Sequence, residues 1–439
     1  MSDRASEWDK YVLGLVLFLS LLIGGGTASG LYTDTLIEVG AIISAAAVLS
    51  QTSGQKIPQS VLWLLIFAVA WLILQIVPLP AGVLIGSRPE VLLGDPSLVG
   101  ESGFRFVSVG VGRTIECLLY LAALAAFFLS VLRLRTEQVQ GLLPFFLMGV
   151  ICNGLAGAIQ YSLSDDIVIE GLLPFTITAG LFANQNHFAA LLFVSIPFVV
   201  YYGLFRGHLV SGSLGLVTLL LLLLAAGSRA GVLIGLAITV LSIVFLSARS
   251  KVRGLSVLAI FIALSVYTIG AWTKIDADAI DPAFGRREFA RTTVEGIQDN
   301  LATGVGFGNF QKAYQIYEKE EMIFKKYVNH AHNDYLEMAF EGGIPAIILM
   351  VLYFVTLGIA LYRIRSDPLQ KAAFLSVFFL LIHSLVDYPL RTEALAMTFA
   401  YMNAIIFHKG FSDRLAQKNK LIEVDHNGDK LFVPIGTSS

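Results

Sequence analysis

The chain has 439 residues, of which 56% are hydrophobic and only 14% are charged, and its mean hydropathy is +0.74. Soluble proteins of this length carry about 25% charged residues, so the composition excludes a soluble globular enzyme and predicts a protein of the bilayer. The net charge of −2 identifies no partner, and we expect no nucleic acid among the partners. Cys117 and Cys152 both have apolar neighbours, which favours packing over a disulfide or a metal pair.

An apolar helix of about 20 residues crosses the hydrocarbon core of a membrane. The chain contains twelve such runs, so we predict an all-α polytopic protein with about 12 transmembrane helices. The runs lie at residues 11–31, 34–51, 60–80, 114–132, 141–161, 187–205, 212–226, 230–248, 254–273, 343–362, 370–388 and 393–408. Because further spans follow, the first run is interpreted as an uncleaved membrane helix and not as a signal peptide.

The positions of Lys and Arg predict the orientation of these spans. With the N-terminus in the cytoplasm, every short loop on the cytoplasmic side is basic, and the C-terminus is cytoplasmic as well. The segments on the other side are longer and mixed in sign. The predicted parts are nine spans (1–273), a large periplasmic loop (274–342), three spans (343–408) and a polar cytoplasmic tail (409–439).

The large loop contains the densest group of chemically useful residues. Its pattern predicts a helix over 285–300, a turn with three glycines over 304–308, and a second helix over 310–323. The run Asn-His-Ala-His-Asn-Asp-Tyr-Leu-Glu at 329–337 then leads into the tenth span. A glycine-rich turn that follows no strand does not predict a dinucleotide fold.

His330 and His332 in this run allow three interpretations. Two histidines followed by an aspartate have ligand types suited to zinc, but no further ligand group follows at a usual spacing, so we expect no metal. A plain loop entering a membrane helix is the simplest interpretation. A histidine with an ordinary pKa of about 6.5 is also suited to act as a general base.

Further polar residues lie at the same predicted side of the membrane. Arg229 is flanked by small residues, so it suits binding of a phosphate by its guanidinium as well as contact with lipid headgroups. Asn184 precedes His187 at the start of the sixth span, where it is suited to cap the helix or to help bind an anion. His383 and Asp387 are spaced one turn apart in the eleventh span and are expected to share a face and pair.

Together, these motifs resemble the O-antigen ligase and O-antigen polymerase superfamily of membrane glycosyltransferases. The resemblance extends from Leu74-Gln75-Ile76-Val77-Pro78-Leu79-Pro80 to the twelfth span. Its most specific parts are Gly180 to Ala189, Ser228-Arg229-Ala230-Gly231, Gly285-Arg286 with the turn 304–310, and His332-Asn333 with Glu341-Gly342-Gly343-Ile344.

The resemblance implies a GT-C-type bundle with a helical periplasmic loop domain in the bacterial inner membrane. The implied reaction is a metal-independent, inverting transfer of a glycan from undecaprenyl diphosphate to an acceptor hydroxyl at the periplasmic face, without a cofactor. The implied catalytic residues are His332, Arg229 and Arg286. Substrate-binding or orienting roles fall to Arg291, His330, Asn333, Glu337, Asn184 and His187.

Several acceptors and one different function class remain open from the sequence. The acceptor is lipid A–core in a ligase, a lipid-linked glycan in an O-antigen or exopolysaccharide polymerase, or a protein hydroxyl in an O-oligosaccharyltransferase. A twelve-helix transporter or flippase is less favoured, because the halves show no repeat and no matching interrupted helices. A purely structural scaffold of a glycan assembly complex is a further alternative, and it predicts that Arg229, Arg286 and His332 are dispensable.

Overall fold

The structure is a computed structural model that describes residues 2–50, 55–80, 104–163, 169–246, 282–319, 328–364, 367–411, 422–424 and 430–432. This part of the chain is mostly helical, which confirms the all-α prediction. Its strands form two short antiparallel pairs, β1 (Leu79–Pro80) with β2 (Phe104–Arg105) and β3 (Ile422–Val424) with β4 (Lys430–Phe432).

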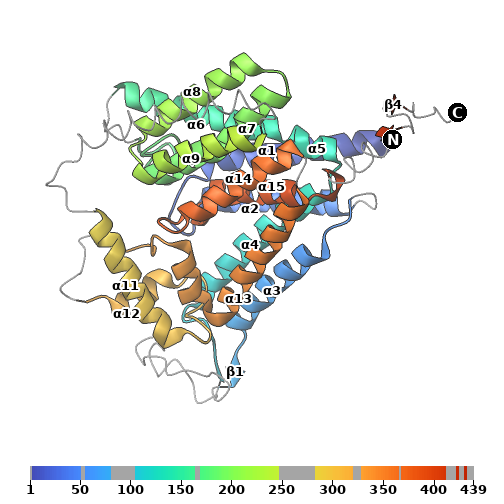
Figure 1. The fold of residues 1–439 in the computed structure, drawn as a ribbon. Coiled ribbons are helices and arrows are strands. Elements are labelled where there is room, and N and C mark those ends of the chain that lie inside the picture. Colours follow the sequence, from blue (N-terminus) through green and yellow to red (C-terminus); the bar gives the residue numbers. More distant parts are fainter. Residues whose placement is uncertain are drawn as a thin grey trace.

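Figure 1 shows the described helices, coloured in chain order. They are α1 (Ser2–Ile23), α2 (Tyr32–Leu49), α3 (Gln59–Ile76), α4 (Val111–Arg133), α5 (Thr136–Gly141), α6 (Leu143–Leu163), α7 (Gln185–Phe205), α8 (Leu209–Ala225), α9 (Arg229–Leu246), α11 (Pro282–Asn300), α12 (Phe310–Tyr317), α13 (Asp334–Arg363), α14 (Pro368–His383), the 3₁₀ helix η4 (Pro389–Arg391) and α15 (Glu393–Phe407). Within the described residues, seven helical segments are long and apolar enough to cross a membrane, and α8, α14 and α15 are shorter apolar helices.

Each expected span except the ninth overlaps a described helix, although α1, α3 and α14 end before the expected limits, and the number of twelve spans stays a prediction. The ninth expected span, 254–273, lies outside the described residues, as does most of the tail after residue 411. The start of α13 differs from expectation, because the helix begins at Asp334 and breaks at Gly343, which has a φ of 60°. The expected second loop helix is also wrong in extent. The helix ends at Tyr317 and not at 323. Its buried residues are apolar, and the residues that follow Tyr317 are charged.

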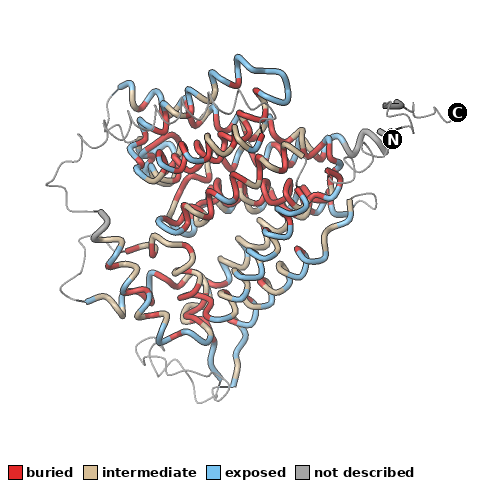
Figure 2. Tube along the Cα trace, viewed as in Figure 1, coloured by how far each residue is buried: buried red, intermediate tan, exposed pale blue. Residues whose placement is uncertain are grey.

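The helices form a dense bundle and a more open wing. In the bundle α7 is central and mostly buried, and it packs against α8, α9 and α14. The wing consists of α3, α13 and one end of α4, and most of the apolar part of α13 is not buried. Figure 2 shows this contrast as red in the bundle and pale blue along the wing. The exposed apolar side chains of the wing are suited to face lipid.

Hydrogen bonds between loops gather several helix ends at one end of the bundle. The amide of Ala394 at the start of α15 donates to the carbonyl of Gly24 after α1, at 2.9 Å. The amide of Asp334, which begins α13, donates to the carbonyl of Ser384 after α14, also at 2.9 Å. This end, called the site end below, carries most of the residues that the sequence singles out.

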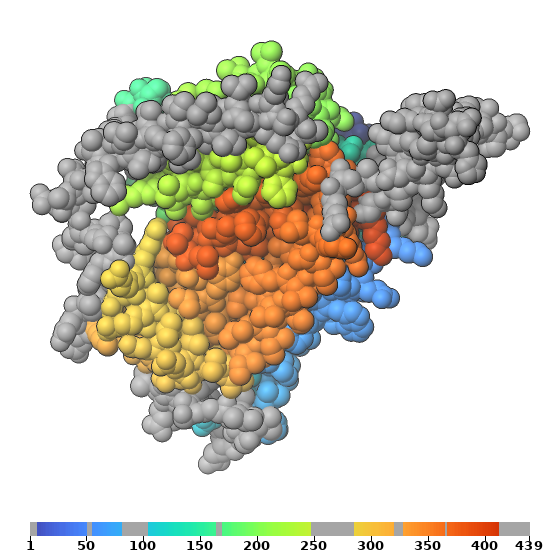
Figure 3. Space-filling view, viewed as in Figure 1, coloured from blue at the N-terminus to red at the C-terminus, as the bar shows by residue number. Residues whose placement is uncertain are grey.

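The glycine-rich turn docks on the break in α13. The Gly306 amide donates to the Glu341 carbonyl at 2.9 Å, and the Ile344 amide donates to the Leu301 carbonyl at 2.8 Å. A Cβ atom on Gly304 would lie 2.3 Å from the Glu341 carbonyl oxygen, so only glycine permits this approach. The turn thus serves to fix α11 and α12 against α13, and Figure 3 shows this yellow segment lying on the orange one.

Candidate active site

Asp387 is the centre of the polar cluster at the site end. It lies in the turn between α14 and η4, and its side chain is only 1% exposed. Asn186 donates from Nδ2 to Oδ2 at 2.6 Å, and Arg286 Nη2 lies 3.5 Å from the same oxygen. His332 Nδ1 lies 3.3 Å from Oδ1. Three separate elements, α7, α11 and the loop before α13, therefore converge on one carboxylate.

The ionisation of Asp387 follows from these neighbours. Burial would raise the pKa of its carboxyl, but the contact with the His332 side chain and the nearby His187 and His383 bring that pKa well below its usual range. Asp387 is thus a carboxylate in ion-pair contact with His332 Nδ1, although this contact lacks the geometry of a hydrogen bond. Within the described residues neither ring nitrogen of His332 makes a hydrogen bond, and the side chain is 22% exposed. The arrangement matches that of an oriented general base.

The backbone of His332 has a conformation that is uncommon for a residue other than glycine. Its φ of 51° lies in the left-handed region, and no other non-glycine residue in the described ranges has a positive φ. The next residue, Asn333, caps α13 by accepting from the amides of Tyr335 and Leu336, each at 3.0 Å. Asn333 Nδ2 also donates to the Leu385 carbonyl at 2.9 Å. The start of α13 and the turn before Asp387 are thereby tied together on both sides of His332.

His330 has a different environment from His332. Its Nδ1 lies 2.8 Å from Glu337 Oε1, and its Nε2 lies 3.4 Å from the Thr27 carbonyl oxygen. Burial would lower the pKa of His330, but the Glu337 carboxylate more than offsets this, so the pKa is raised. Both ring nitrogens face acceptors, which favours the imidazolium. His330 is thus better suited to hold the loop than to accept a proton.

Arg391 forms a second polar cluster beside the first. Its guanidinium lies 3.0 Å from Glu341, 3.5 Å from Glu337 and 3.8 Å from Asp334. These carboxyl groups have helical i, i+3 and i+7 spacing at the start of α13 and share one face. Glu341 also accepts from the amide of Phe310 at 3.1 Å. Arg391 therefore links the start of α13 to the loop helices.

Tyr388 connects the histidines of the two clusters. Its ring centroid lies 4.2 Å from that of His330, 4.8 Å from that of His187 and 4.9 Å from that of His332. His187 is fully buried, with its Nε2 3.9 Å from Asp387. His187 is therefore near the Asp387 carboxylate but out of contact with solvent.

The structure corrects one expected pair and confirms one expected cap. Because α14 ends at His383, Asp387 lies beyond the helix in the following turn and not on a shared helical face. The ring nitrogens of His383 have no hydrogen-bond partner in the described part of the chain, so the expected pairing of His383 with Asp387 is wrong. Asn184 caps α7 as predicted, and its side chain accepts from the Asn186 amide at 2.8 Å.

The three arginines to which the sequence assigns catalytic or substrate-binding roles have unequal surroundings. Arg286 is 36% exposed and reaches Asp387 from α11. Arg229 is the exposed first residue of α9, and in the described part of the chain it makes no hydrogen bond or ion pair. Arg291 is occupied by acidic residues of its own helix, with Glu288 at 3.4 Å and Glu295 at 3.6 Å. Arg286 and Arg229 are therefore better placed than Arg291 to meet an added anion.

Sequence reasoning missed the roles of Asp387 and Arg391 as the two centres. A signal was available, because ionisable residues next to membrane spans commonly have partners or functions. The same reasoning would not have identified the side chains that contact Asp387 and Arg391, because these come from helices far apart in the chain. Among the described residues, no group of three or more His, Cys, Asp and Glu side chains is arranged to hold a metal ion.

A comparison with protein families identifies a matching segment of the chain. Residues 214–351 match the family described as O-antigen ligase. The matched segment contains Arg229, Arg286 and the loop with His332, whereas Asp387 and Arg391 lie beyond it. No curated protein matches the chain. The family match confirms the resemblance to the O-antigen ligase superfamily and indicates a glycosyltransferase-like membrane enzyme.

Proposed function

We propose that this protein transfers a glycan from undecaprenyl diphosphate to an acceptor hydroxyl at the periplasmic face of the bacterial inner membrane. The observation that carries the proposal is the position of His332. Its Nδ1 lies 3.3 Å from Asp387 Oδ1, its Nε2 makes no hydrogen bond in the described structure, and Arg286 contacts the same carboxylate. The proposal places the N- and C-termini in the cytoplasm and the site end in the periplasm, in agreement with the distribution of Lys and Arg.

In the proposed reaction the acceptor hydroxyl attacks the anomeric carbon of the donor. The new carbon–oxygen bond forms as the bond to the diphosphate breaks, and the hydroxyl proton passes to His332 Nε2. Asp387 stabilises the imidazolium that results and keeps Nδ1 protonated. The diphosphate departs with the bonding electrons, and attack from the opposite face inverts the anomeric configuration.

Cationic side chains at the site end would stabilise the departing diphosphate. Arg286 is held near Asp387 at one edge of its guanidinium, so its remaining donors are able to meet phosphate oxygens. Arg229 has a free and exposed guanidinium in the described structure. In this proposal the two arginines do the work that a metal ion does in other transferases, so the reaction needs no metal. Such electrostatic stabilisation is commonly the largest contribution to catalysis.

The acceptor we favour is lipid A–core, because the matching family is described as O-antigen ligase. Polymerases and protein O-oligosaccharyltransferases would use the same donor chemistry. They differ only in which hydroxyl reaches His332. The product of a reconstituted reaction therefore identifies the acceptor.

The test uses purified protein in lipid nanodiscs with an undecaprenyl-diphosphate oligosaccharide, a chelator, and either lipid A–core or no added acceptor. Products are resolved by gel electrophoresis and mass spectrometry. We expect a single adduct on lipid A–core, and a ladder of lipid-linked products would instead identify a polymerase. His332→Ala should lower the rate at least about 100-fold, the usual contribution of a general base.

A matched histidine provides the control. His208 lies at the start of α8, outside both polar clusters, and its ring contacts Tyr202. His208→Ala should retain the rate of the wild-type protein. Equal activity of His332→Ala and His208→Ala would contradict the assignment of the base, and the absence of transfer from every donor tested would contradict the proposed reaction.

A further inference from the structure

Hydrogen bonds do not account for the orientation of the His332 ring. In the described structure neither ring nitrogen makes a hydrogen bond, and the 3.3 Å contact of Nδ1 with Asp387 lacks hydrogen-bond geometry. A general base has to direct one ring nitrogen at the hydroxyl from which it takes a proton. The ring is therefore held by its packing as well as by the backbone that carries it.

Two aromatic rings pack against the imidazole of His332. Phe289 of α11 is stacked on it, with ring centroids 5.7 Å apart and planes inclined by 27°. Tyr388 meets it edge to face, with centroids 4.9 Å apart and planes inclined by 79°. A stacked contact and a perpendicular contact together restrict rotation of the imidazole about its side-chain torsions. Of the two rings, Phe289 is the one that belongs to the loop helices.

Phe289 is itself supported by a chain of aromatic contacts across the loop helices. Its ring meets Tyr314 of α12 edge to face at 6.4 Å, and Tyr314 packs against Phe310 at 5.2 Å. Phe310 in turn contacts Phe340 of α13 at 5.9 Å. These three supporting side chains are all buried. The ring that packs on His332 is therefore backed by a small core of its own.

The same face of α11 carries Phe289 and Arg286. The two residues are three positions apart, a spacing that places helical side chains next to each other. Arg286 Nη2 lies 3.5 Å from Asp387 Oδ2, while Phe289 packs on His332. The helix that brings a cation to the candidate site therefore also holds one side of the candidate base.

We propose that Phe289 is a positioning residue for glycan transfer, whose ring directs His332 Nε2 to the acceptor hydroxyl and whose π face stabilises the imidazolium that forms. The inference rests on the proposed function for the identity of the base. A cation within about 6 Å of an aromatic centroid is attracted by the negative face of the ring. The 5.7 Å separation and the 27° inclination meet this condition. Phe289 exchanges no proton and acts through His332.

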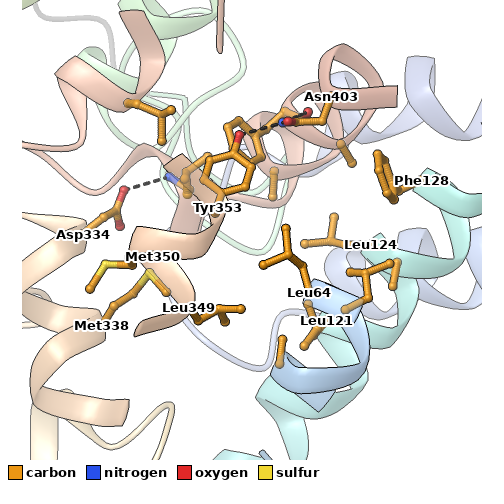
Figure 4. A pocket seen from close by; sticks show the side chains of 18 of the residues that line it. Leu64, Leu121, Leu124, Phe128, Asp334, Met338, Leu349, Met350, Tyr353 and Asn403 are labelled. Atoms are coloured by element: carbon orange, nitrogen blue, oxygen red, sulfur yellow. Dashed lines mark hydrogen bonds between the residues drawn. The ribbon is translucent and has the colours of Figure 1, made fainter. Parts of the chain in front are cut away.

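The surroundings of Phe289 are separate from the apolar cavity beside the site. That cavity of about 350 Å³ lies mainly between α3, α4, α13 and α15, and its wall includes Asp334 and Met338 (Figure 4). Neither His332 nor Phe289 lines it. A substitution of Phe289 is therefore expected to change the surroundings of the base and to leave the wall of the cavity as it is.

Substitution of Phe289 also leaves the charged and titratable groups around His332 in place. Asp387 faces the imidazole from the turn after α14, and His187 of α7 interacts with it electrostatically. Further charged or titratable groups on the elements of this cluster are Arg286, Arg287 and Glu288 of α11, His330, His383 and Tyr388. A change in the pH dependence of His332 that follows removal of an uncharged ring therefore reports the contact with that ring.

The test compares Phe289→Leu, which has no π face, with Phe289→Tyr, which keeps the ring. The full-length protein in nanodiscs is treated with diethyl pyrocarbonate, which modifies imidazole nitrogens that carry no proton. Modification of His332 is followed by mass spectrometry from about pH 5 to pH 9. In Phe289→Leu the half-maximal pH should move downward by about half a unit, a roughly threefold loss of proton affinity. Phe289→Tyr should keep the wild-type profile.

Glycan transfer supplies a second readout and a control. The rate at saturating donor should fall about tenfold in Phe289→Leu, because the base is less well aligned, and it should recover in Phe289→Tyr. Phe310→Leu is the control for loosening of the loop core. In the described part of the chain the Phe310 ring pairs with Tyr314 and Phe340 and with no histidine ring. Phe310→Leu should lower the thermal midpoint but leave the pH profile of His332 modification unchanged.

The outcomes separate this inference from the proposed function. An unchanged profile in Phe289→Leu, or an equal shift in Phe310→Leu or Phe289→Tyr, would overturn the role of Phe289 even if the wild-type protein transfers glycan. A downward shift in Phe289→Leu alone would support it even if no transfer were found, and then only the proposed reaction would fail. If thermal unfolding shows that Phe289→Leu does not fold, Phe289→Met, which also lacks a ring, takes its place.

Discussion

The two polar clusters at the site end have opposite charge arrangements. Around Asp387 a single carboxylate meets His332 and Arg286, two partners that remain partly exposed. Around Arg391 a single guanidinium meets three carboxyl groups that are all buried. The first cluster has spare donors that face outward, and the second is closed by its own members. The comparison indicates that the open cluster performs chemistry and the closed one maintains the geometry.

His330 connects the two arrangements. Through Glu337 it belongs to the Arg391 cluster. The amide of Ala331, the residue between His330 and His332, donates to the same carboxylate. A positive charge on His330 adds to that of Arg391 against the three carboxyl groups. The closed cluster therefore approaches balance. In the open cluster Arg286 balances the charge of Asp387 and has further donors that suit a diphosphate.

The largest effect is expected from removing the centre of the closed cluster. Arg391→Met leaves buried carboxylates without their cation, which should lower the free energy of unfolding by about 3–5 kcal/mol. Unfolding in a mild detergent, followed by circular dichroism, measures this change. Arg286→Met is the control, and as a partly exposed residue it should change stability by less than about 1 kcal/mol. Equal losses in the two variants would contradict the assigned division of roles.

The next effect concerns the centre of the open cluster. Asp387→Asn keeps the size of the side chain but no longer holds a protonated Nδ1 on His332 by charge. Glycan transfer should fall about 100-fold, equivalent to about 2.7 kcal/mol in the activation barrier. The rate at saturating donor is the measurement, with unfolding recorded in parallel. A variant that unfolds more readily but transfers glycan at the wild-type rate would show that Asp387 stabilises the fold and does not take part in catalysis.

Much of the fold could be predicted from local sequence alone. Long apolar runs identify spans, because a bilayer admits few alternatives to a helix. The start of α13 was harder, because Asp334 and Glu337 are polar and would ordinarily be assigned to a loop. They are helical because Arg391, His330 and the Asn333 cap satisfy them. None of those partners is visible from the local hydrophobic pattern.

The candidate site was predicted in its residues but not in its organisation. The run around His332 identified a reactive segment, yet the two histidines could not be ranked without their neighbours. The contact between His332 and Asp387 forms only when the start of α13 packs beside the end of α14. The pairing expected for His383 and Asp387 failed for a related reason, since it assumed that α14 continues past His383.

A smaller effect separates two adjacent arginines of α11. Arg286 reaches the open cluster, whereas Arg287 is exposed and in the described structure makes no ion pair. Lysine retains the charge but loses the paired donors that grip phosphate oxygens. Arg286→Lys should therefore lower transfer about tenfold, or about 1.4 kcal/mol, and Arg287→Lys should have no effect. Donor-dependent rates distinguish the two, and equal behaviour would remove Arg286 from diphosphate binding.

The smallest effect concerns the pH dependence of His330, the residue shared by both clusters. Its pKa is raised in the folded protein, because the Glu337 carboxylate outweighs burial. Folding therefore binds a proton more tightly, so the stabilisation is fully present below the unfolded pKa of about 6.5. It is lost as the pH rises through the higher folded value. The contribution should be that of a single hydrogen bond, roughly 1 kcal/mol.

The measurement compares wild type with His330→Gln, whose amide can still donate to Glu337 but does not titrate. The thermal midpoint of the wild-type protein should exceed that of the variant at pH 6, and the difference should shrink steadily towards pH 9. A difference that grows with pH would mean that His330 is held neutral. In that case His330 would regain its place as an alternative base, and the division between an open and a closed cluster would fail at the residue that joins them.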